Sequence, residues 1–391
     1  MRLRSIFDAK NLQGKRVLVR CGFDVPLSKN GKIEDESRIK EALPTLRYLQ
    51  KKKTRIILLT HIGRPSGKRI ARLSTKPIAK ILSQLLLKKV FFIPEKDINI
   101  LSKKIARLQE GEIVLLENLR FWRGEKENNP LFAEQIAHLG DMYINEAFSN
   151  SHRNDASMVG VPQYIPSYAG FHLEAEVAAI EKFLLHQQHP VVAVIGGVKI
   201  SSKLGVILRM LRVVDHVILG GALANTVLAA KGISVGKSFI EKEMIARIKA
   251  VPLTSRKLHI PVDALMSESM ERPKKMRIDA IGDVNKKCFI VDIGPETTKL
   301  YQNIIQNART AFFAGPMGKF EIKAFSQGTF EVLRAAKKVK GYTLAGGGDT
   351  MHAIHSAKIE SSFDYISSAG GATLQFLEGK TLPALKPLLE K

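Results

Sequence analysis

The sequence predicts a two-lobed α/β protein in which each lobe is a parallel sheet flanked by helices. Its 391 residues exceed what one hydrophobic core usually serves, which favours two domains. Short apolar runs alternate with amphipathic helical patterns in both halves, an arrangement typical of parallel strands joined by helices. A long helix-forming stretch separates the two halves. These three observations define the expected architecture.

In the first half, five apolar runs predict strands, and helical periodicity lies between them. Residues 39–52 and 74–89 are expected to form helices, the second with Ser74 as its N-cap. We assign residues 1–170 to an N-terminal lobe. The predicted strands cover residues 16–23, 55–62, 90–93, 112–119 and 141–148.

A connector leads into the second half. Residues 173–188 are rich in strong helix formers and stop before Pro190, so we predict a hinge helix over residues 171–189. Residues 190–374 then form a C-terminal lobe. Residues from about 375 to 391 are expected to pack back on the N-terminal lobe, because their end is too apolar for a free tail. The strand-to-helix junctions of the C-terminal lobe are glycine-rich, at 196–197, 220–221, 346–348 and 370–371.

Composition argues against a membrane, secreted or zinc-binding protein. No apolar run approaches the roughly 20 residues that span a bilayer, and the N-terminus lacks the apolar core of a secretory signal. The two cysteines, Cys21 and Cys288, lie far apart and outside any CxxC pattern, so neither a disulfide framework nor a zinc site is expected. We expect a cytoplasmic protein without a membrane partner.

The net charge of +24 has two interpretations. A nucleic-acid-binding protein concentrates such charge on one face, whereas the basic clusters here are short, scattered and not interleaved with aromatic residues. We favour a solvated lysine-rich surface that attracts anionic substrates over long range. Nucleic-acid binding is the less favoured alternative.

Basic side chains follow several strand ends in the first half. His61 and Arg64 follow the second predicted strand. Arg120 follows the fourth, Arg153 follows the fifth, and Arg38 lies just ahead of a helix. Ligands of open parallel sheets bind beyond the carboxyl ends of the strands, and guanidinium groups bind phosphate and carboxylate in bidentate fashion. A surface salt bridge would explain any one of them, but their agreement predicts a pocket for a small anion.

In the second half, the glycine-rich junctions let the backbone approach a polyphosphate closely. Lys199 and Lys203 follow the first junction at a spacing that puts both near one helix start. Asp349 stands among glycines at another helix start, where a carboxylate either caps the helix or holds a phosphate-bound magnesium ion. The common nucleotide fingerprints GxxxxGK[ST] and GxGxxG are absent.

Seven motifs, in order and across essentially the whole chain, resemble those of the phosphoglycerate kinase family. They are RCGFDVP (20–26), THIGRP (60–65), ENLRFWRGE (117–125), GGVKISSK (196–203), DIGPETT (292–298), GPMGKFE (315–321) and GGGDT (346–350). The resemblance implies two Rossmann-like lobes joined by a hinge helix. It also implies reversible phosphoryl transfer between 1,3-bisphosphoglycerate and ADP, which gives 3-phosphoglycerate and ATP in glycolysis and gluconeogenesis.

By matching motif positions, the resemblance assigns phosphoglycerate to the N-terminal lobe and the magnesium nucleotide to the C-terminal lobe. Glu321 would hold the ribose, and Asp349 would hold Mg²⁺ through the nucleotide. The catalytic set would be Arg38, Lys199, Lys203, Gly370 and Gly371. The substrate-binding set would be Asp24, Arg38, His61, Ile62, Gly63, Arg64, Arg120 and Arg153. The nucleotide-binding set would be Lys203, Gly294, Glu321, Gly347, Gly348, Asp349 and Thr350.

This chemistry needs no general base, because the phosphoryl acceptor is a carboxylate that is ionised at neutral pH. The remaining tasks are to hold donor and acceptor in line and to neutralise the charge on the transferring group, which Arg, Lys, Mg²⁺ and backbone amides can do. Since the two ligands belong to different lobes, we expect closure about the hinge. The resemblance also implies a monomer.

Several positions depart from the family pattern. The usual RVDFNVP is RCGFDVP here, so Gly22 stands for an Asp that contacts the glycerate, and Asp24 stands for an Asn. Because residues two apart in a strand share a face, Asp24 is expected to replace part of the missing acceptor. The usual NGP, TGGGA and GGAK also change, at Ala314, at 368–369 and at Val198. Two alternatives to an active kinase therefore stand, a binding protein of the same fold with little turnover and a nucleic-acid-binding protein.

Overall fold

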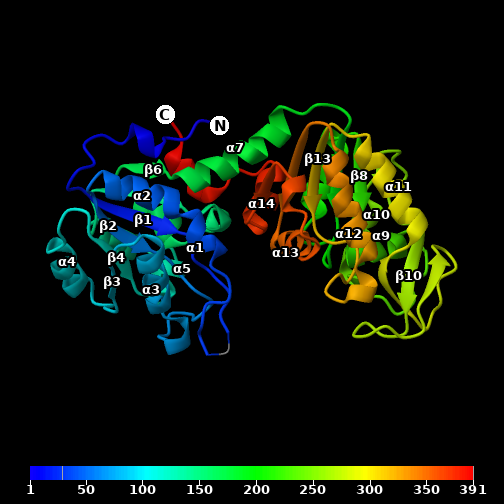
Figure 1. The fold of residues 1–391 in the computed structure, drawn as a ribbon, viewed down its shortest axis with the longest axis horizontal. Coiled ribbons are helices and arrows are strands. Elements are labelled where there is room, and N and C mark those ends of the chain that lie inside the picture. The colour runs from blue at the N-terminus through cyan, green and yellow to red at the C-terminus, as the bar shows by residue number, and fades with distance from the viewer. Residues whose placement is uncertain (29, 391) are drawn as a thin grey trace. The chain divides into compact units, whose positions relative to one another are not determined.

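A computed structural model describes residues 1–28 and 30–390, which form two compact units (Figure 1). The first unit contains Met1–Ala178 and the segment from Thr381 onward, and the second contains Ala179–Lys380. The division falls inside α7 (Phe171–Leu185). The chain returns to the first unit at Thr381, later than position 375, because α14 (Gly371–Leu377) still packs on α8 (Leu204–Val213) of the second unit.

The first unit is built on a six-stranded parallel sheet with the strand order β3-β4-β2-β1-β5-β6. Val17 and Val19 pack on one face, in a core shared with α1, α2 and α3, whereas Leu18 packs on the other face with α4 and α6. Central strands buried on both faces are typical of parallel sheets covered by helices. The strands are β1 (Arg16–Cys21), β2 (Arg55–Leu59), β3 (Val90–Ile93), β4 (Ile113–Leu116), β5 (Met142–Glu146) and β6 (Ser167–Ala169). The helices are α1 (Ser37–Glu41), α2 (Leu43–Lys51), α3 (Lys76–Leu85), α4 (Ile98–Ala106), α5 (Arg123–Lys126) and α6 (Pro130–Ala137).

Two predicted helices differ in detail from the observed ones. The helix expected over residues 39–52 is divided at Ala42, and Pro44 stands in the first turn of α2, where its missing N–H costs no hydrogen bond. The N-cap of α3 is Thr75 and not Ser74, whose hydroxyl instead donates to Glu117 over 2.9 Å.

The second unit is built on another six-stranded parallel sheet, with the order β15-β14-β13-β7-β8-β9. Apolar side chains of α11, α12 and α13 share one core with β7 and β13. The predicted fold class is therefore confirmed. The strands are β7 (Val191–Ile195), β8 (His216–Leu219), β9 (Leu258–His259), β13 (Thr310–Ala314), β14 (Tyr342–Gly346) and β15 (Tyr365–Ser367). The further helices are α9 (Gly221–Ala230), α10 (Ile245–Lys249), α11 (Pro295–Gln306), α12 (Gln327–Arg334) and α13 (Gly348–Ala357).

A small antiparallel sheet in the second unit was not predicted. It has the order β11-β10-β12, formed by β10 (Asp263–Ser267), β11 (Arg277–Ala280) and β12 (Phe289–Ile293). Three of the four residues of β11 are exposed, and its sequence mixes charged and apolar residues, so it carries no apolar run. This sheet matters for function because β12 borders a cavity described below.

The C-terminal segment packs on the first unit. Leu385 and Leu388 of the 3₁₀ helix Pro383–Leu388 are fully buried, and the amide of Ala384 donates to the carbonyl of Ser151 over 3.1 Å. Among the described residues, no helix combines the length and apolar character needed to cross a membrane.

Candidate active site

Several residues predicted to bind an anion lie in loops at one edge of the sheet of the first unit. Strands β2, β1 and β5 are neighbours, so the loops that follow their carboxyl ends lie together. β1 ends at Cys21 and β2 at Leu59, which places Asp24 and His61 in these loops. A cavity of about 480 Å³ opens there, lined by Arg64, Ser66, Arg120, Lys126, His152 and Arg153.

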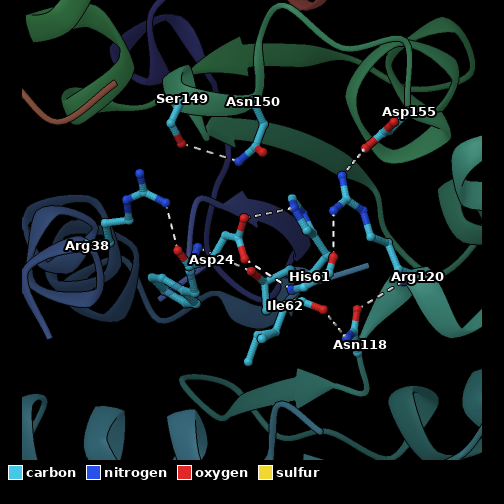
Figure 2. Close-up of polar contacts among 12 residues, drawn as sticks. Asp24, Arg38, His61, Ile62, Asn118, Arg120, Ser149, Asn150 and Asp155 are labelled. Atoms are coloured by element: carbon cyan, nitrogen blue, oxygen red, sulfur yellow. Dashed lines mark hydrogen bonds and ion pairs between the residues drawn. The ribbon is translucent and has the colours of Figure 1, made fainter. Parts of the chain in front are cut away.

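Asp24 is the centre of a set of polar contacts in these loops (Figure 2). Its Oδ1 accepts the amide N–H of Gly63 over 3.1 Å, and its Oδ2 lies 3.7 Å from Nε2 of His61. Arg38 donates to the Asp24 carbonyl over 2.7 Å. Burial alone would raise the pKa of Asp24. Contacts with His61, the Gly63 amide and Arg38 instead hold this pKa well below its usual value. Arg38 itself lies inside α1, whereas the sequence suggested a position just ahead of a helix.

His61 is buried and presents a proton donor to this site. A guanidinium only donates, so the 2.6 Å contact between Arg20 and Nδ1 makes Nδ1 the acceptor and leaves the proton on Nε2. Nε2 has no hydrogen-bond partner within the described part of the chain. Burial lowers the pKa of His61 to about 3, with Arg20 and Arg120 acting in the same direction and Asp24 opposing them. The ring is therefore neutral at physiological pH and can donate one hydrogen bond to a ligand.

Arg120 is held rigidly, with a side chain only 3% exposed. It donates to the Gly63 carbonyl over 2.7 Å and to Oδ2 of Asp155 over 3.2 Å. Its Nε has no partner in residues 1–28 and 30–390. Ile62, also in the predicted set, is buried, and its carbonyl accepts from Asn118 over 2.8 Å. Figure 2 shows these contacts converging on the loop after β2.

The space beside Gly22 is bordered by the loop after β5. A Cβ at this position would lie 3.1 Å from Oγ of Ser149 and 3.8 Å from Nδ2 of Asn150. Because β1 ends at Cys21, the argument from strand alternation does not apply to Gly22 and Asp24. Asp24 reaches the site through its loop and not as part of a strand face.

In the second unit, the neighbouring strands β14, β13, β7 and β8 end on glycine-rich loops. A Cβ on Gly196 would lie 2.1 Å from the Pro316 carbonyl, so only glycine allows the loops after β7 and β13 to pack this closely. A cavity of about 390 Å³ lies here. It is lined by Gly197, Val198, Gly221, Ala222, Met270, Ile290, Val291, Asp292, Pro316, Met317, Gly318, Lys319, Glu321 and Asp349.

Helix N-termini approach one another near this cavity. Gly347 has a φ of 102°, which glycine adopts readily, and it precedes α13. A Cβ on Gly370, the residue before α14, would lie 3.8 Å from the Cα of Gly347. The free amides of Gly348, Gly371 and their neighbours therefore belong to helix starts that can bind anions.

The two predicted lysines differ in environment. Lys199 is exposed, whereas Lys203 donates to the carbonyls of Gly196 and Ala314 over 2.5 and 2.9 Å. Burial lowers the pKa of Lys203 to about 8, and the charge of Asp349 opposes this shift. Lys203 therefore carries most of its charge at neutral pH and loses it in mildly alkaline solution.

Only Glu321 and Asp349 of the predicted nucleotide set line this cavity, and the other members, Lys203, Gly294, Gly347, Gly348 and Thr350, are not among its lining residues. The Thr350 hydroxyl accepts from the Gly315 amide over 2.7 Å and donates to the Gly346 carbonyl over 2.8 Å. Gly294 packs against the Asp263 carboxylate, so a Cβ there would clash. No sequence pattern singled out the polar cavity-lining residues Ser66, Lys126, His152, Asp292 and Lys319.

The second cavity offers a suitable donor for a nucleotide-bound magnesium ion. Mg²⁺ in such sites takes one or two carboxylates together with phosphate oxygens and waters. Asp349, in the first turn of α13, supplies a carboxylate. Asp292 is less suitable, because its oxygens accept the amides of Gly328 and Ile293, and burial raises its pKa to about 8. The described residues contain no group of three or more side chains that could hold a metal ion.

Comparisons with known proteins agree with one another. A family model described as phosphoglycerate kinase matches residues 6–380. The phosphoglycerate kinase of Bartonella bacilliformis is 41% identical over 100% of this chain and 99% of that protein, and that of Pelotomaculum thermopropionicum is 40% identical over 97% and 98%. A solved structure of phosphoglycerate kinase from Coxiella burnetii matches with a TM-score of 0.88 and 38% identity, covering 99% of each chain.

Proposed function

The chain belongs to the phosphoglycerate kinase family, and from this premise we propose how its residues carry the reaction. The enzyme is a transferase that moves a phosphoryl group reversibly between 1,3-bisphosphoglycerate and ADP, a step of glycolysis. The alternatives of a binding protein with little turnover and of a nucleic-acid-binding protein are not favoured. The observation that supports our assignment of residues most directly is the pair of cavities, one cationic and one bordered by glycine loops, at the strand ends of two separate units.

In the first unit, the cationic cavity is our proposed site for 3-phosphoglycerate. Arg64, Arg120 and Arg153 neutralise its phosphate, and the neutral His61 donates its Nε2 proton. Asp24 accepts from the glycerate hydroxyl. Ile62 and Gly63 shape the loop, since their carbonyls are held by Asn118 and Arg120.

In the second unit, the cavity beside the glycine loops is our proposed nucleotide site. Glu321 accepts from the ribose, and Asp349 would hold Mg²⁺, which would supply positive charge against the phosphates when the nucleotide is bound. Gly347 and Gly348 present amides to the phosphates, and Thr350 holds the Gly315 loop in place. Gly294 acts through its packing on Asp263.

For the transfer itself, we propose charge neutralisation without a general base. Arg38, Lys199, Lys203 and the amides of Gly370 and Gly371 surround the equatorial oxygens of the moving phosphoryl group. Because each ligand belongs to a different unit, the units must bring them together, and we propose residues 171–189 as the hinge. We further propose a cytoplasmic monomer, as expected for a glycolytic enzyme of this family.

A steady-state assay tests the proposal. With 3-phosphoglycerate and magnesium ATP, product formation coupled to NADH oxidation should saturate in both substrates and should disappear with EDTA. Asp349→Asn keeps the size of the side chain and serves as the matched variant. If the unaltered protein shows saturable turnover and Asp349→Asn turns over equally fast, Asp349 is excluded as the magnesium ligand.

A further inference from the structure

The cationic cavity contains one lysine that none of the family motifs assigns. Lys126, the last residue of α5, lines this cavity together with Arg64, Arg120 and Arg153. Its side chain is 54% exposed, so its ammonium group is accessible to a ligand.

A buried carboxylate sets the position of Lys126. Asp155 is only 1% exposed, and its two oxygens hold different cations: Oδ1 accepts from Nζ of Lys126 over 2.9 Å and Oδ2 from Arg120 over 3.2 Å. Burial would raise the pKa of Asp155, but Lys126 and Arg120 hold it below its usual value, so the carboxylate stays charged. Figure 2 shows the Arg120 half of this arrangement. Asp155 thus fixes the spacing between an arginine and a lysine at the edge of one cavity.

Asp155 does not accept hydrogen bonds from all the N–H donors of Lys126 and Arg120. An ammonium group has three N–H donors, and Lys126 has a single acceptor among its hydrogen bonds and ion pairs in the described residues. Arg120 keeps a buried Nε without a partner in the same part of the chain. A tetrahedral phosphate dianion, with several acceptor oxygens and two charges, complements such a pair.

We propose that Lys126 binds the phosphate group of 3-phosphoglycerate, held at the cavity by the carboxylate of Asp155. This inference rests on the proposed function for its substrate and adds a fifth cation to the four arginines assigned by the motifs. A purely structural ion pair would place the lysine against Asp155 equally well, so the test must separate charge seen by the ligand from support of the fold.

Lys126→Gln separates the effect of charge on the ligand from support of the fold, because the Gln amide can still donate to Asp155 but carries no charge. Lys126→Arg keeps both the donor and the charge. The matched control is Lys104→Gln, since Lys104 donates to Glu95 over 2.8 Å, is 46% exposed and is not among the residues lining the cavity. Calorimetric titration with inorganic phosphate and with 3-phosphoglycerate gives the Kd, and the fitted stoichiometry reports the folded fraction independently.

We expect Lys126→Gln to weaken the binding of both ligands about tenfold, the loss typical of one charged hydrogen bond. Its KM for 3-phosphoglycerate should rise in parallel, while its KM for magnesium ATP stays unchanged. Lys126→Arg and Lys104→Gln should stay within twofold of the unaltered protein. A Kd for phosphate and for 3-phosphoglycerate within twofold of normal in Lys126→Gln overturns the inference. If the unaltered protein binds phosphate through Lys126 but shows no turnover, the proposed function fails and the binding site stands.

Discussion

Restoring the carboxylate that is missing at Gly22 should improve the enzyme, but only when the charge at Asp24 is removed. The backbone φ of Gly22 is not in the positive region, so an Asp is allowed there. The new Cβ would lie 3.1 Å from Oγ of Ser149, which must shift by a few tenths of an ångström. The Ser149 hydroxyl and the Asn150 amide then border the new carboxylate as hydrogen-bond donors.

The expected magnitudes come from two opposing terms. A hydrogen bond from the glycerate hydroxyl to a carboxylate contributes about 1.5 kcal/mol, or roughly tenfold in kcat/KM. Carboxylates on residues two apart in an extended segment lie roughly 6 Å from each other and repel by about 0.7 kcal/mol in water and by about 3 kcal/mol at an effective dielectric constant of 20. Gly22→Asp alone should therefore be neutral or harmful, whereas Gly22→Asp with Asp24→Asn should raise kcat/KM for 3-phosphoglycerate by up to about tenfold.

Asp24→Asn alone supplies the decisive comparison. Its amide oxygen can still accept from Gly63, so the loop is preserved, but the charged acceptor facing the substrate is lost. kcat/KM for 3-phosphoglycerate should fall, while KM for magnesium ATP stays the same. Steady-state kinetics of the three variants and of Ser149→Gly/Gly22→Asp, which removes the close contact, complete the set. A neutral or beneficial Asp24→Asn would refute the reasoning, because substrate binding would then depend on the arginines and His61 alone.

Four further predictions follow from single residues. Asp349→Ala should abolish turnover with magnesium nucleotide without changing the melting temperature, and retention of more than about a tenth of kcat, about 1.4 kcal/mol, would exclude this role. Arg120→Ala should mainly raise KM for 3-phosphoglycerate, and it should lower stability because Asp155 loses a partner. Arg38→Ala and Lys199→Ala should mainly lower kcat. If steady-state kinetics show the opposite division, the proposed roles of these residues are exchanged. The pKa of Lys203 is about 8, and its charged form is our proposed phosphate ligand, so kcat/KM for the nucleotide should decline as pH rises through 8. Lys203→Arg should move this decline to higher pH, and a profile flat to pH 9 in the unaltered enzyme would contradict the prediction. Burial raises the pKa of Glu146 from 4.5 to about 8, so the folded state keeps a proton that the unfolded state loses. The unfolding free energy should therefore fall as pH rises from about 4.5 to 8. In Glu146→Gln, denaturant titrations should show an unfolding free energy that depends less on pH.

Candidate site residues are easiest to predict from the sequence at the ends of parallel strands. Ligands lie beyond the carboxyl ends of parallel strands, and this rule identified Arg64, Arg120 and Arg153, which the structure brings to one cavity. The same rule located the glycine loops of the second unit, because a strand followed by glycines is visible as a short apolar run with a sharp end.

Residues whose role depends on three-dimensional packing were not predictable in this way. Lys126 lies in a short helix and resembles any solvated lysine until the buried carboxylate of Asp155, 29 residues later, is seen to hold it. Strand β11 of the antiparallel sheet, which also contains Asp292 in β12 at the proposed nucleotide cavity, mixes charged and apolar residues and has no apolar run. Conversely, Thr350 matches a motif, yet its hydroxyl is used inside the protein, since hydrogen-bond partners cannot be read from a motif.

The decisive measurement follows the phosphoryl group from its donor to its acceptor. 1,3-Bisphosphoglycerate labelled with ³²P in its acyl phosphate is mixed with magnesium ADP and excess protein, and the reaction is quenched after a single turnover. The label should appear in the γ-phosphate of ATP, and 3-phosphoglycerate should form in equal amount. Label that appears only as inorganic phosphate, or that stays in the acyl phosphate, would contradict this prediction.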